Sequence, residues 1–446
     1  MARFEPKSTA PVRERAILVG VDFGRSSDWT LDESMAELAR LADTDGADVV
    51  FTLTQHLESP VPRTFIGKGK VEELVSYVRN LDADVVIFDD ELTPSQQSNL
   101  EKIVGEPVKI IDRTALILDI FGVHAKTREG RLQVQLAQLQ YVLPRLRGMW
   151  SHLVGEQTRG GIGSRFGQGE SQLEVDRRLV RKRISTLRDE LARLETRREV
   201  QSKARWDSGV YRVALAGYTN AGKSTLLNAL TGSTVYVQDE LFATLDPTTR
   251  SIELEEGRRV TLTDTVGFIQ KLPTTLVEAF KSTLAEVRAA DLVLLVADAS
   301  DPGVDRQIHA VRSVLEEISA NQIPSVLVLN KSDLVTAEDL TNIQAKYPGA
   351  VTISAREGTG IAGLLYRVAR EASRGDATVT VLVPFSKGIL MKMVHERCQV
   401  IREVYTEQGL LATVSASERM RLTLAPYAVP DDDAGVWQDS SPATEE

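Results

Sequence analysis

A glycine-rich segment followed by lysine and serine is where this sequence could bind phosphate. Residues 213–216 form an apolar run, Gly217 to Ser224 read Gly-Tyr-Thr-Asn-Ala-Gly-Lys-Ser, and an apolar helical pattern follows. Glycines in such a loop let backbone N–H groups turn toward a β-phosphate at the start of a helix. Lys223 would reach the β- and γ-phosphates, and the Ser224 hydroxyl would bind Mg²⁺. The segment therefore predicts a phosphate-binding loop for a nucleoside triphosphate.

An Asp-x-x-Gly segment ends the next clear strand pattern, at residues 262–267. Asp264 can hold magnesium through a water molecule, while the Gly267 N–H can sense a γ-phosphate. This pattern is common in turns, and its place after a phosphate loop is what favours a nucleotide role.

One threonine between these two segments should complete the magnesium shell when the triphosphate is bound. Residues 241–250 offer Thr244, Thr248 and Thr249. We favour Thr244, because it has a small neighbour and precedes the strand pattern that starts at Ser251. The other two threonines lead directly into that strand and stay open as alternatives.

A later segment would select the base. Residues 326–329 form an apolar strand pattern that leads into Asn330-Lys331-Ser332-Asp333. The Asp333 carboxylate can accept hydrogen bonds from the guanine N1–H and 2-amino group, and adenine would leave it unpaired. The Lys331 stem can pack along the base, Asn330 can tie this loop to the phosphate loop, and residues 351–355 can place a backbone N–H at guanine O6.

The five elements, in this order, predict a GTP-binding and GTP-hydrolysing protein with Mg²⁺ as its cofactor. The expected catalytic residues are Lys223, Thr244 and Gly267, and the expected magnesium ligands are Ser224 and Thr244, with Asp264 acting through water. The expected GTP-binding residues are Gly217, Tyr218, Thr219, Asn220, Ala221, Gly222, Lys223, Ser224, Thr225, Phe242, Ala243, Thr244, Leu245, Asp246, Asp264, Thr265, Val266, Gly267, Asn330, Lys331, Ser332, Asp333, Ser354, Ala355 and Arg356.

Length and composition predict a soluble chain of several domains. Its 446 residues exceed what a single core normally organises, and 42% hydrophobic with 26% charged residues is typical of globular proteins. No apolar run of about 18 residues suggests a membrane span, and the first residues lack the apolar stretch of a signal peptide. The single cysteine, Cys398, suits a reducing cytoplasm and a place in a core. We expect a cytoplasmic monomer.

The pattern of strands and helices predicts a multidomain α/β fold in five parts. Strand and helix patterns alternate in the first part, so we expect a small parallel α/β domain. The C-terminal part reads as a strand over residues 379–383, a helix over 388–404, and strands over 410–415 and 420–424. The expected parts are an N-terminal α/β domain (1–126), a helical coiled-coil hairpin (127–208), a P-loop GTPase domain (209–375), a small C-terminal α+β domain (376–429) and an acidic disordered tail (430–446).

A basic helical hairpin stands out in this acidic chain. Apolar residues repeat at helical spacing in two stretches, Leu132 to Leu143 and Leu173 to Leu194, which can bury each other as antiparallel helices. Between them, residues 155–169 hold many glycines and few apolar side chains, which predicts a mobile basic tip. Residues 141–206 carry 15 Lys/Arg against 8 Asp/Glu, a local charge of +7, although the whole chain carries −10. Such an island indicates a polyanionic partner.

At this point the sequence resembles the HflX family of GTPases. The resemblance covers residues 15–426 and rests on motifs at residues 65–70, 112–113, 160–165, 169–178, 217–224, 242–246, 264–268 and 330–333. The stretch after Arg165 reads Phe-Gly-Gln-Gly, where the family usually shows Gly-Pro-Gly, and this departure concerns the conformation of the loop.

The resemblance implies a GTPase that binds the large ribosomal subunit and splits or rescues stalled or idle ribosomes under stress. The cations suited to rRNA phosphates are Arg159, Arg165, Arg177, Arg178, Arg181, Lys182 and Arg183. Phe268 stands where many small GTPases carry a water-orienting glutamine, so we expect slow intrinsic hydrolysis completed by a partner or another residue. Two alternatives stay open: a GTP-dependent switch that acts on a protein partner, and an RNA-remodelling NTPase that uses the N-terminal domain.

Overall fold

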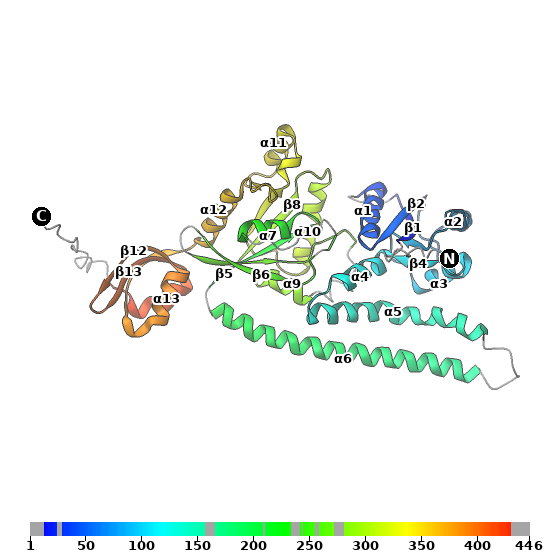
Figure 1. Cartoon of the computed structure of the whole chain (residues 1–446), viewed down its shortest axis with the longest axis horizontal. Helices are drawn as coiled ribbons and strands as arrows, with labels where there is room; N and C mark the ends of the chain where they lie inside the picture. Colours follow the sequence, from blue (N-terminus) through cyan, green and yellow to red (C-terminus); the bar gives the residue numbers. More distant parts are fainter. Residues whose placement is uncertain are drawn as a thin grey trace, which may run out of the picture. The chain divides into compact units, whose positions relative to one another are not determined.

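The computed structural model describes residues 13–24, 29–156, 166–207, 210–232, 241–242, 244–254, 258–271 and 281–429, and Figure 1 shows their elements along the chain. The chain divides into two compact units. One comprises Met1–Thr196, Gln238–Asp246 and Val266–Thr283, and the other comprises Arg197–Val237, Pro247–Thr265 and Leu284–Glu446. The segment that contains Thr244, which we call the first switch, and the segment that follows Thr265 and contains Gly267, which we call the second switch, therefore pack with the N-terminal part of the chain.

The first unit begins with a parallel four-stranded sheet in the order β2-β1-β3-β4. Its elements are β1 (Glu14–Asp22), α1 (Leu31–Thr44), β2 (Ala47–His56), α2 (Lys68–Asn80), β3 (Val85–Phe88), α3 (Pro94–Val104) and β4 (Lys109–Asp112). Thr93 and Gln96 form the capping box that starts α3. The predicted parallel α/β domain is confirmed.

Three helices follow: α4 (Arg113–His124), α5 (Arg128–Glu156) and α6 (Phe166–Asp207). Helices α5 and α6 run antiparallel beside each other (Figure 1) and bury a leucine seam between them. The seam contains Leu132, Leu136, Leu139, Leu143, Val180, Ile184, Leu187, Leu191 and Leu194. The predicted helical hairpin is confirmed in this part.

The prediction of a loop over residues 155–169 is wrong at both ends of this range. Helix α5 includes Glu156 and α6 begins at Phe166. Glycine costs a helix only about 1 kcal/mol, so good helix formers such as Gln168, Glu170 and Leu173 can carry α6 through this stretch. The rest of the predicted tip, with Arg159 and Arg165, lies outside the described residues.

The second unit contains a six-stranded sheet in the order β10-β9-β8-β5-β7-β6, in which β6 alone is antiparallel to its neighbour. Its elements are β5 (Tyr211–Gly217), α7 (Lys223–Thr231), β6 (Thr248–Glu253), β7 (Arg259–Asp264), α9 (Lys281–Arg288), β8 (Leu292–Asp298), α10 (Val304–Glu317), β9 (Ser325–Asn330), η1 (Ser332–Leu334), α11 (Ala337–Lys346), β10 (Val351–Thr352) and α12 (Ile361–Ala372). Parallel strands end at one edge of a sheet, and ligands of such sheets bind at that edge. Gly217, Asp264 and Asn330 are the last residues of β5, β7 and β9.

The C-terminal part is a three-stranded antiparallel sheet in the order β11-β13-β12. Its elements are β11 (Ala377–Pro384), η2 (Phe385–Lys387), α13 (Gly388–Arg397), β12 (Gln399–Thr406), β13 (Gly409–Ala416), α14 (Glu418–Leu424) and η3 (Ala425–Tyr427). The helix predicted over residues 388–404 is too long, because a run rich in β-branched residues after Cys398 forms β12. The strand predicted over 420–424 is wrong, because Ser417 caps α14 by accepting the Met420 N–H.

The structure also bears on the predictions for Cys398 and for membrane spans. Cys398 is buried in the C-terminal core as a free thiol, and burial raises its pKa to about 11. Among the described helices, none combines the length and the apolar character needed to cross a bilayer. The predicted C-terminal tail lies outside the described residues.

Candidate nucleotide-binding site

Close backbone approaches in the phosphate loop explain its two glycines. A Cβ on Gly217 would lie 2.2 Å from the Val296 carbonyl oxygen of the neighbouring strand. Gly222 has a φ of +88°, and a Cβ there would lie 2.3 Å from Nδ2 of Asn330. Both positions exclude any larger residue without a shift of the loop, so the loop geometry requires glycine at its start and at the first turn of α7.

Lys223 crosses this loop from the start of α7. Its Nζ donates hydrogen bonds to the carbonyl oxygens of Gly217, at 3.1 Å, and Tyr218, at 2.8 Å. Burial lowers the pKa of the ammonium to about 8, although the charge of Asp264 acts in the opposite direction. Burial removes the water that would stabilise the charge of this ammonium, and its carbonyl partners are neutral. A nearby phosphate would therefore stabilise the charged form strongly.

Ser224 and Asp264 place a hydroxyl and a carboxylate side by side. The Ser224 hydroxyl donates to Oδ2 of Asp264 at 2.6 Å. The next residue, Thr265, is fully buried and donates to the Leu215 carbonyl oxygen at 2.7 Å. This anchors the end of β7 on β5, so the two oxygen groups are held at the edge of the sheet.

Asn330 joins two loops at this edge. Its Nδ2 donates to the Ala221 carbonyl oxygen at 2.8 Å, and its Oδ1 accepts the Ala355 N–H at 3.0 Å. The tie between this asparagine and the phosphate loop is therefore confirmed. The Ala355 N–H is thus already bound to Asn330, and the placement of a backbone N–H of this segment at guanine O6 stays a prediction.

The neighbouring residues of this loop are more exposed. Lys331 adopts a left-handed backbone with a φ of +61°, and its Nζ pairs with Asp298 at 2.7 Å. Asp333 lies in η1 with its side chain exposed, whereas Ser354 is fully buried. A base that covers Asp333 would remove water from this carboxylate. Asp333 would then favour guanine over adenine, because only guanine offers both hydrogen bonds, from N1–H and from the 2-amino group.

The first-switch segment, residues 241–246, packs against α4 in the first unit. Leu241, Phe242 and Leu245 are buried, and the ring centroid of Phe242 lies 4.5 Å from that of Phe121. Thr244 is half-buried between these anchors, and Ala243 lies outside the described residues.

The segment after Asp264 is also buried. Val266 and Phe268 are no more than 5% exposed, and Gly267 between them is buried as well. Phe268 is thus a core residue, which fits the expectation that it orients no water molecule. Val266, Gly267 and Phe268 belong to the first unit, whereas the phosphate loop belongs to the second.

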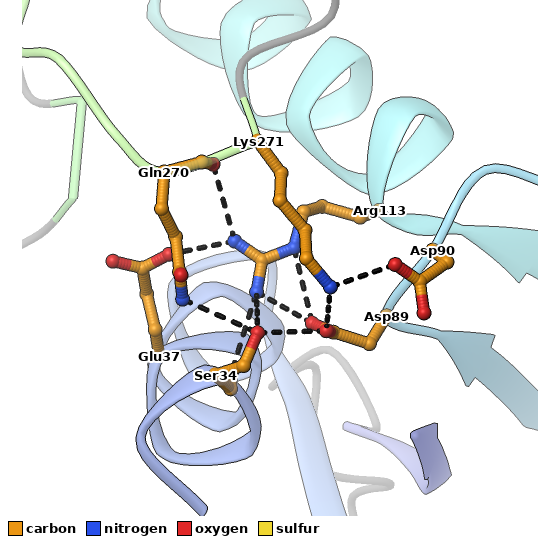
Figure 2. A network of polar contacts seen from close by, with 7 residues as sticks. All are labelled: Ser34, Glu37, Asp89, Asp90, Arg113, Gln270 and Lys271. Carbon is orange, nitrogen blue, oxygen red and sulfur yellow. Dashed lines mark hydrogen bonds and ion pairs between the residues drawn. The ribbon is translucent and has the colours of Figure 1, made fainter. Parts of the chain in front are cut away.

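Arg113, at the start of α4, is the centre of a buried polar network (Figure 2). Its guanidinium donates to Glu37 at 2.6 Å, to Asp89 at 2.5 Å and to the Gln270 carbonyl oxygen at 3.5 Å. The Gln270 side chain donates to the Ser34 hydroxyl at 3.2 Å. The segment that follows Gly267 is therefore held by residues of the N-terminal sheet domain.

Lys271, the residue after Gln270, adds a second cation to this network (Figure 2). Its ammonium pairs with Asp89 at 2.5 Å and with Asp90 at 2.7 Å. Burial raises the pKa of Asp89, but the charges of Arg113 and Lys271 outweigh it and hold this pKa below its usual value.

Sequence reasoning found the phosphate and base loops and missed the network at the second switch. The Asp-Arg pair at residues 112–113 was noted only as part of a motif, and Gln270 and Lys271 carried no signal of their own. In the N-terminal domain, Lys68 is exposed and Lys70 pairs with Glu73 at 2.6 Å. Neither lysine indicates a second phosphate site.

The fold and the site define a P-loop GTPase: a strand, a Gly-x-x-x-x-Gly-Lys-Ser loop and a helix, beside an Asp-x-x-Gly strand and an Asn-Lys-x-Asp loop. Among the described residues, no group of three or more His, Cys, Asp or Glu side chains is placed to hold a metal ion.

Comparisons with known proteins agree with this class. Three family models match: "GTP-binding GTPase N-terminal" at residues 32–122, "GTP-binding GTPase Middle Region" at 124–205 and "50S ribosome-binding GTPase" at 212–331. GTPase HflX of Caldanaerobacter subterraneus subsp. tengcongensis is 47% identical, over 92% of this chain and 93% of that protein. GTPase HflX of Escherichia coli K12 is 42% identical, over 91% of this chain and 93% of its own length.

A solved GTP-binding protein from Sulfolobus solfataricus, in complex with GDP, aligns with a TM-score of 0.43 and 22% identity, over 81% of this chain and 99% of that one. The 47% and 42% identities to the two HflX proteins, over 92% and 91% of this chain, decide the family. This chain belongs to the HflX family of GTPases; it binds and hydrolyses GTP.

Proposed function

We propose that this GTPase acts on the large ribosomal subunit and splits or rescues stalled or idle ribosomes. The observation that carries the proposal is the cationic face of α6. Arg178, Arg181, Lys182 and Arg183 are exposed and Arg177 is half-buried, within seven residues of a chain whose net charge is −10. Like charges at this density repel one another unless a polyanion meets them. The match to a family model described as "50S ribosome-binding GTPase" supports the same partner.

The nucleotide chemistry of the proposal uses Mg²⁺. The Ser224 hydroxyl would bind the ion directly, and Asp264 would hold it through water, as their 2.6 Å contact allows. Oxygen groups of this kind are the ligands that Mg²⁺ prefers. Thr244 would add a second hydroxyl when the first switch closes. When bound, the ion neutralises phosphate charge.

Base selection and phosphate binding use the chain's own groups. Lys223 would exchange its two carbonyl partners for the β- and γ-phosphates, and the Gly267 N–H would sense the γ-phosphate. Asp333 would accept hydrogen bonds from guanine, while Lys331 packs along the base. The Ala355 N–H donates to Asn330 and the Ser354 N–H donates to the Thr359 carbonyl oxygen at 3.0 Å, so we assign guanine O6 to the N–H of the next residue, Arg356.

Hydrolysis would depend on the partner. The buried ring of Phe268 cannot orient an attacking water through hydrogen bonds, so the group that does so comes from elsewhere. Stimulation of GTP turnover by large subunits follows from this proposal.

The test is charge reversal on α6. Replacing Arg177, Arg178 and Lys182 with glutamate should leave GTP binding and thermal stability nearly unchanged. Co-sedimentation with large subunits should weaken, and its salt dependence should become shallower by roughly one unit of slope for each lost phosphate contact. Stimulation of GTP turnover should fall with binding.

A matched control changes the same charge elsewhere. Arg312, Arg370 and Lys392 are exposed on α10, α12 and α13, and their replacement with glutamate should leave subunit binding intact. Unchanged binding in the α6 variant, or equal loss in both variants, would refute the proposed α6 contact and favour a switch that acts on a protein partner.

A further inference from the structure

The carboxylate of Asp246 lies at the start of helix α5. Its Oδ2 accepts the backbone N–H groups of Lys126, at 2.9 Å, and Thr127, at 2.7 Å. The Thr127 hydroxyl donates to its Oδ1. The first N–H groups of a helix lack partners within the helix, and a negative charge near them is favourable. Lys126 and Thr127 directly precede Arg128, the first residue of α5, so the first-switch segment binds the residue that caps this helix and places a negative charge at its start.

Gly130, in the first turn of α5, leaves the space that this carboxylate occupies. A Cβ there would lie 2.4 Å from Oδ1 of Asp246 and 3.3 Å from its Cγ. The Gly130 N–H donates to the Thr127 hydroxyl at 3.0 Å, so the same threonine caps α5 and binds Asp246. Because glycine is disfavoured inside a helix relative to alanine, its presence here fits a need for the carboxylate.

A second anchor holds the other end of this segment. Phe242 is buried against Phe121 of α4, with its backbone in the left-handed region at a φ of +59°. A large side chain adopts this conformation only where its surroundings compensate the strain. Thr244 thus lies between two fixed points, Phe242 on α4 and Asp246 on α5.

We propose that Asp246 is a positioning residue for GTP hydrolysis, which places Thr244 by binding the start of helix α5 of the hairpin. Loss of this contact frees one end of the segment that carries Thr244, so turnover falls while the phosphate and base loops still bind nucleotide. The coupling is reciprocal: a partner that moves the start of α5 changes the position of Thr244. The proposal rests on the assignment of Thr244 to magnesium, and it is independent of the ribosome.

The experiment compares variants of the full chain without ribosomes. Asp246→Ala removes the carboxylate that binds Lys126 and Thr127 and leaves the Thr127 hydroxyl at the start of α5. Gly130→Ala inserts a methyl group where the carboxylate lies, and the carboxylate, as the end of a side chain, can move away without disturbing the fold. Gly69→Ala is the matched control, because Gly69 lies in the first turn of α2 with no atom within 4 Å of its Cβ position.

We expect kcat for GTP to fall about five- to tenfold in Asp246→Ala and in Gly130→Ala, because the segment with Thr244 is then held at one end only. GDP affinity should stay within about twofold of the parent, and Gly69→Ala should keep the parent kcat. The double variant Asp246→Ala/Gly130→Ala should turn over GTP at the rate of Asp246→Ala, because both changes act through one contact.

Two results would overturn the proposal: a parent-like kcat in Asp246→Ala, whether or not its unfolding midpoint falls, or additive losses in the double variant. Thr244→Ala separates the two assignments. If Thr244→Ala keeps full turnover, the magnesium assignment fails; if it loses turnover and Asp246→Ala does not, the positioning role of Asp246 fails.

Discussion

Lys271 and Asp89 form an ion pair at 2.5 Å although 182 positions separate them in the chain. Asp89 directly follows β3 of the N-terminal sheet, and Lys271 follows the Asp-x-x-Gly segment. Because Arg113 binds the same carboxylate and the Gln270 carbonyl oxygen, the second switch is attached to the N-terminal domain by two cations (Figure 2).

Burial should make these two cations unequal in their contribution to stability. Arg113 is 2% exposed, and its loss would leave Asp89 and Glu37 charged and buried. Arg113→Ala should lower the free energy of unfolding by roughly 3–5 kcal/mol, the usual cost of breaking a buried pair. The Lys271 side chain is 41% exposed, so Lys271→Ala should cost about 1 kcal/mol or less. Urea titration measures both, and equal losses would contradict this reading of the network.

The network also predicts a pH dependence of stability. The pKa of Asp89 lies below its usual value in the folded state, so the folded protein holds the charged form more strongly than the unfolded chain does. This contribution is present above the unfolded pKa of about 3.9 and is lost as the pH falls through the folded pKa. Between about pH 5 and pH 2, unfolding midpoints should therefore fall less steeply in Asp89→Asn than in the parent. Parallel curves would exclude Asp89 as a source of acid sensitivity.

Nucleotide affinity should depend on pH through Lys223. Burial lowers the pKa of this ammonium to about 8 in the free protein, and phosphate favours its charged form. Below pH 8 the lysine is already protonated, whereas above it binding must take up a proton. GDP affinity should therefore be flat from pH 6.5 to 7.5 and then fall toward about tenfold per pH unit. Titration calorimetry measures this in two buffers of different ionisation enthalpy, with Lys223→Met as the control that loses the Lys223 contribution.

Magnesium dependence should separate Ser224 from its neighbours. Ser224→Ala removes the hydroxyl that lies 2.6 Å from Asp264. The Mg²⁺ concentration at half-maximal turnover should therefore rise at least about tenfold. Ser224→Thr keeps a hydroxyl and should retain most of the parent's dependence. A Mg²⁺ titration of GTP turnover that is identical in the alanine variant would remove Ser224 from the metal site.

Local patterns predicted most of the fold and of the phosphate and base loops. Gly217, Gly222 and Lys223 could be found because their roles depend on neighbours in sequence, and Asn330 because it follows a buried strand. The contacts of Arg113 and Asp246 join segments far apart in the chain, where no spacing rule applies. The error at residues 420–424 has a local cause: Ser417 is a helix-cap signal, and the prediction of a strand did not use it.

Asp333 should select guanine, and its replacement should change the preferred base. Asp333→Asn turns one hydrogen-bond acceptor into a donor. Guanine then presents its 2-amino group to an amide NH₂, whereas xanthine presents a 2-oxo group that accepts from it. GTP affinity should fall at least about tenfold and xanthosine triphosphate affinity should rise, because each unmatched polar pair in a covered site costs about 1–3 kcal/mol.

Glu338→Gln serves as the control for this variant. Glu338 is exposed at the start of α11, five positions beyond Asp333, and its replacement makes the same change of charge. Competition binding with GTP, ATP and xanthosine triphosphate gives the preference of each variant. If Asp333→Asn keeps the parent's ratio of GTP to xanthosine triphosphate affinity, or if Glu338→Gln shifts it equally, Asp333 does not read the base.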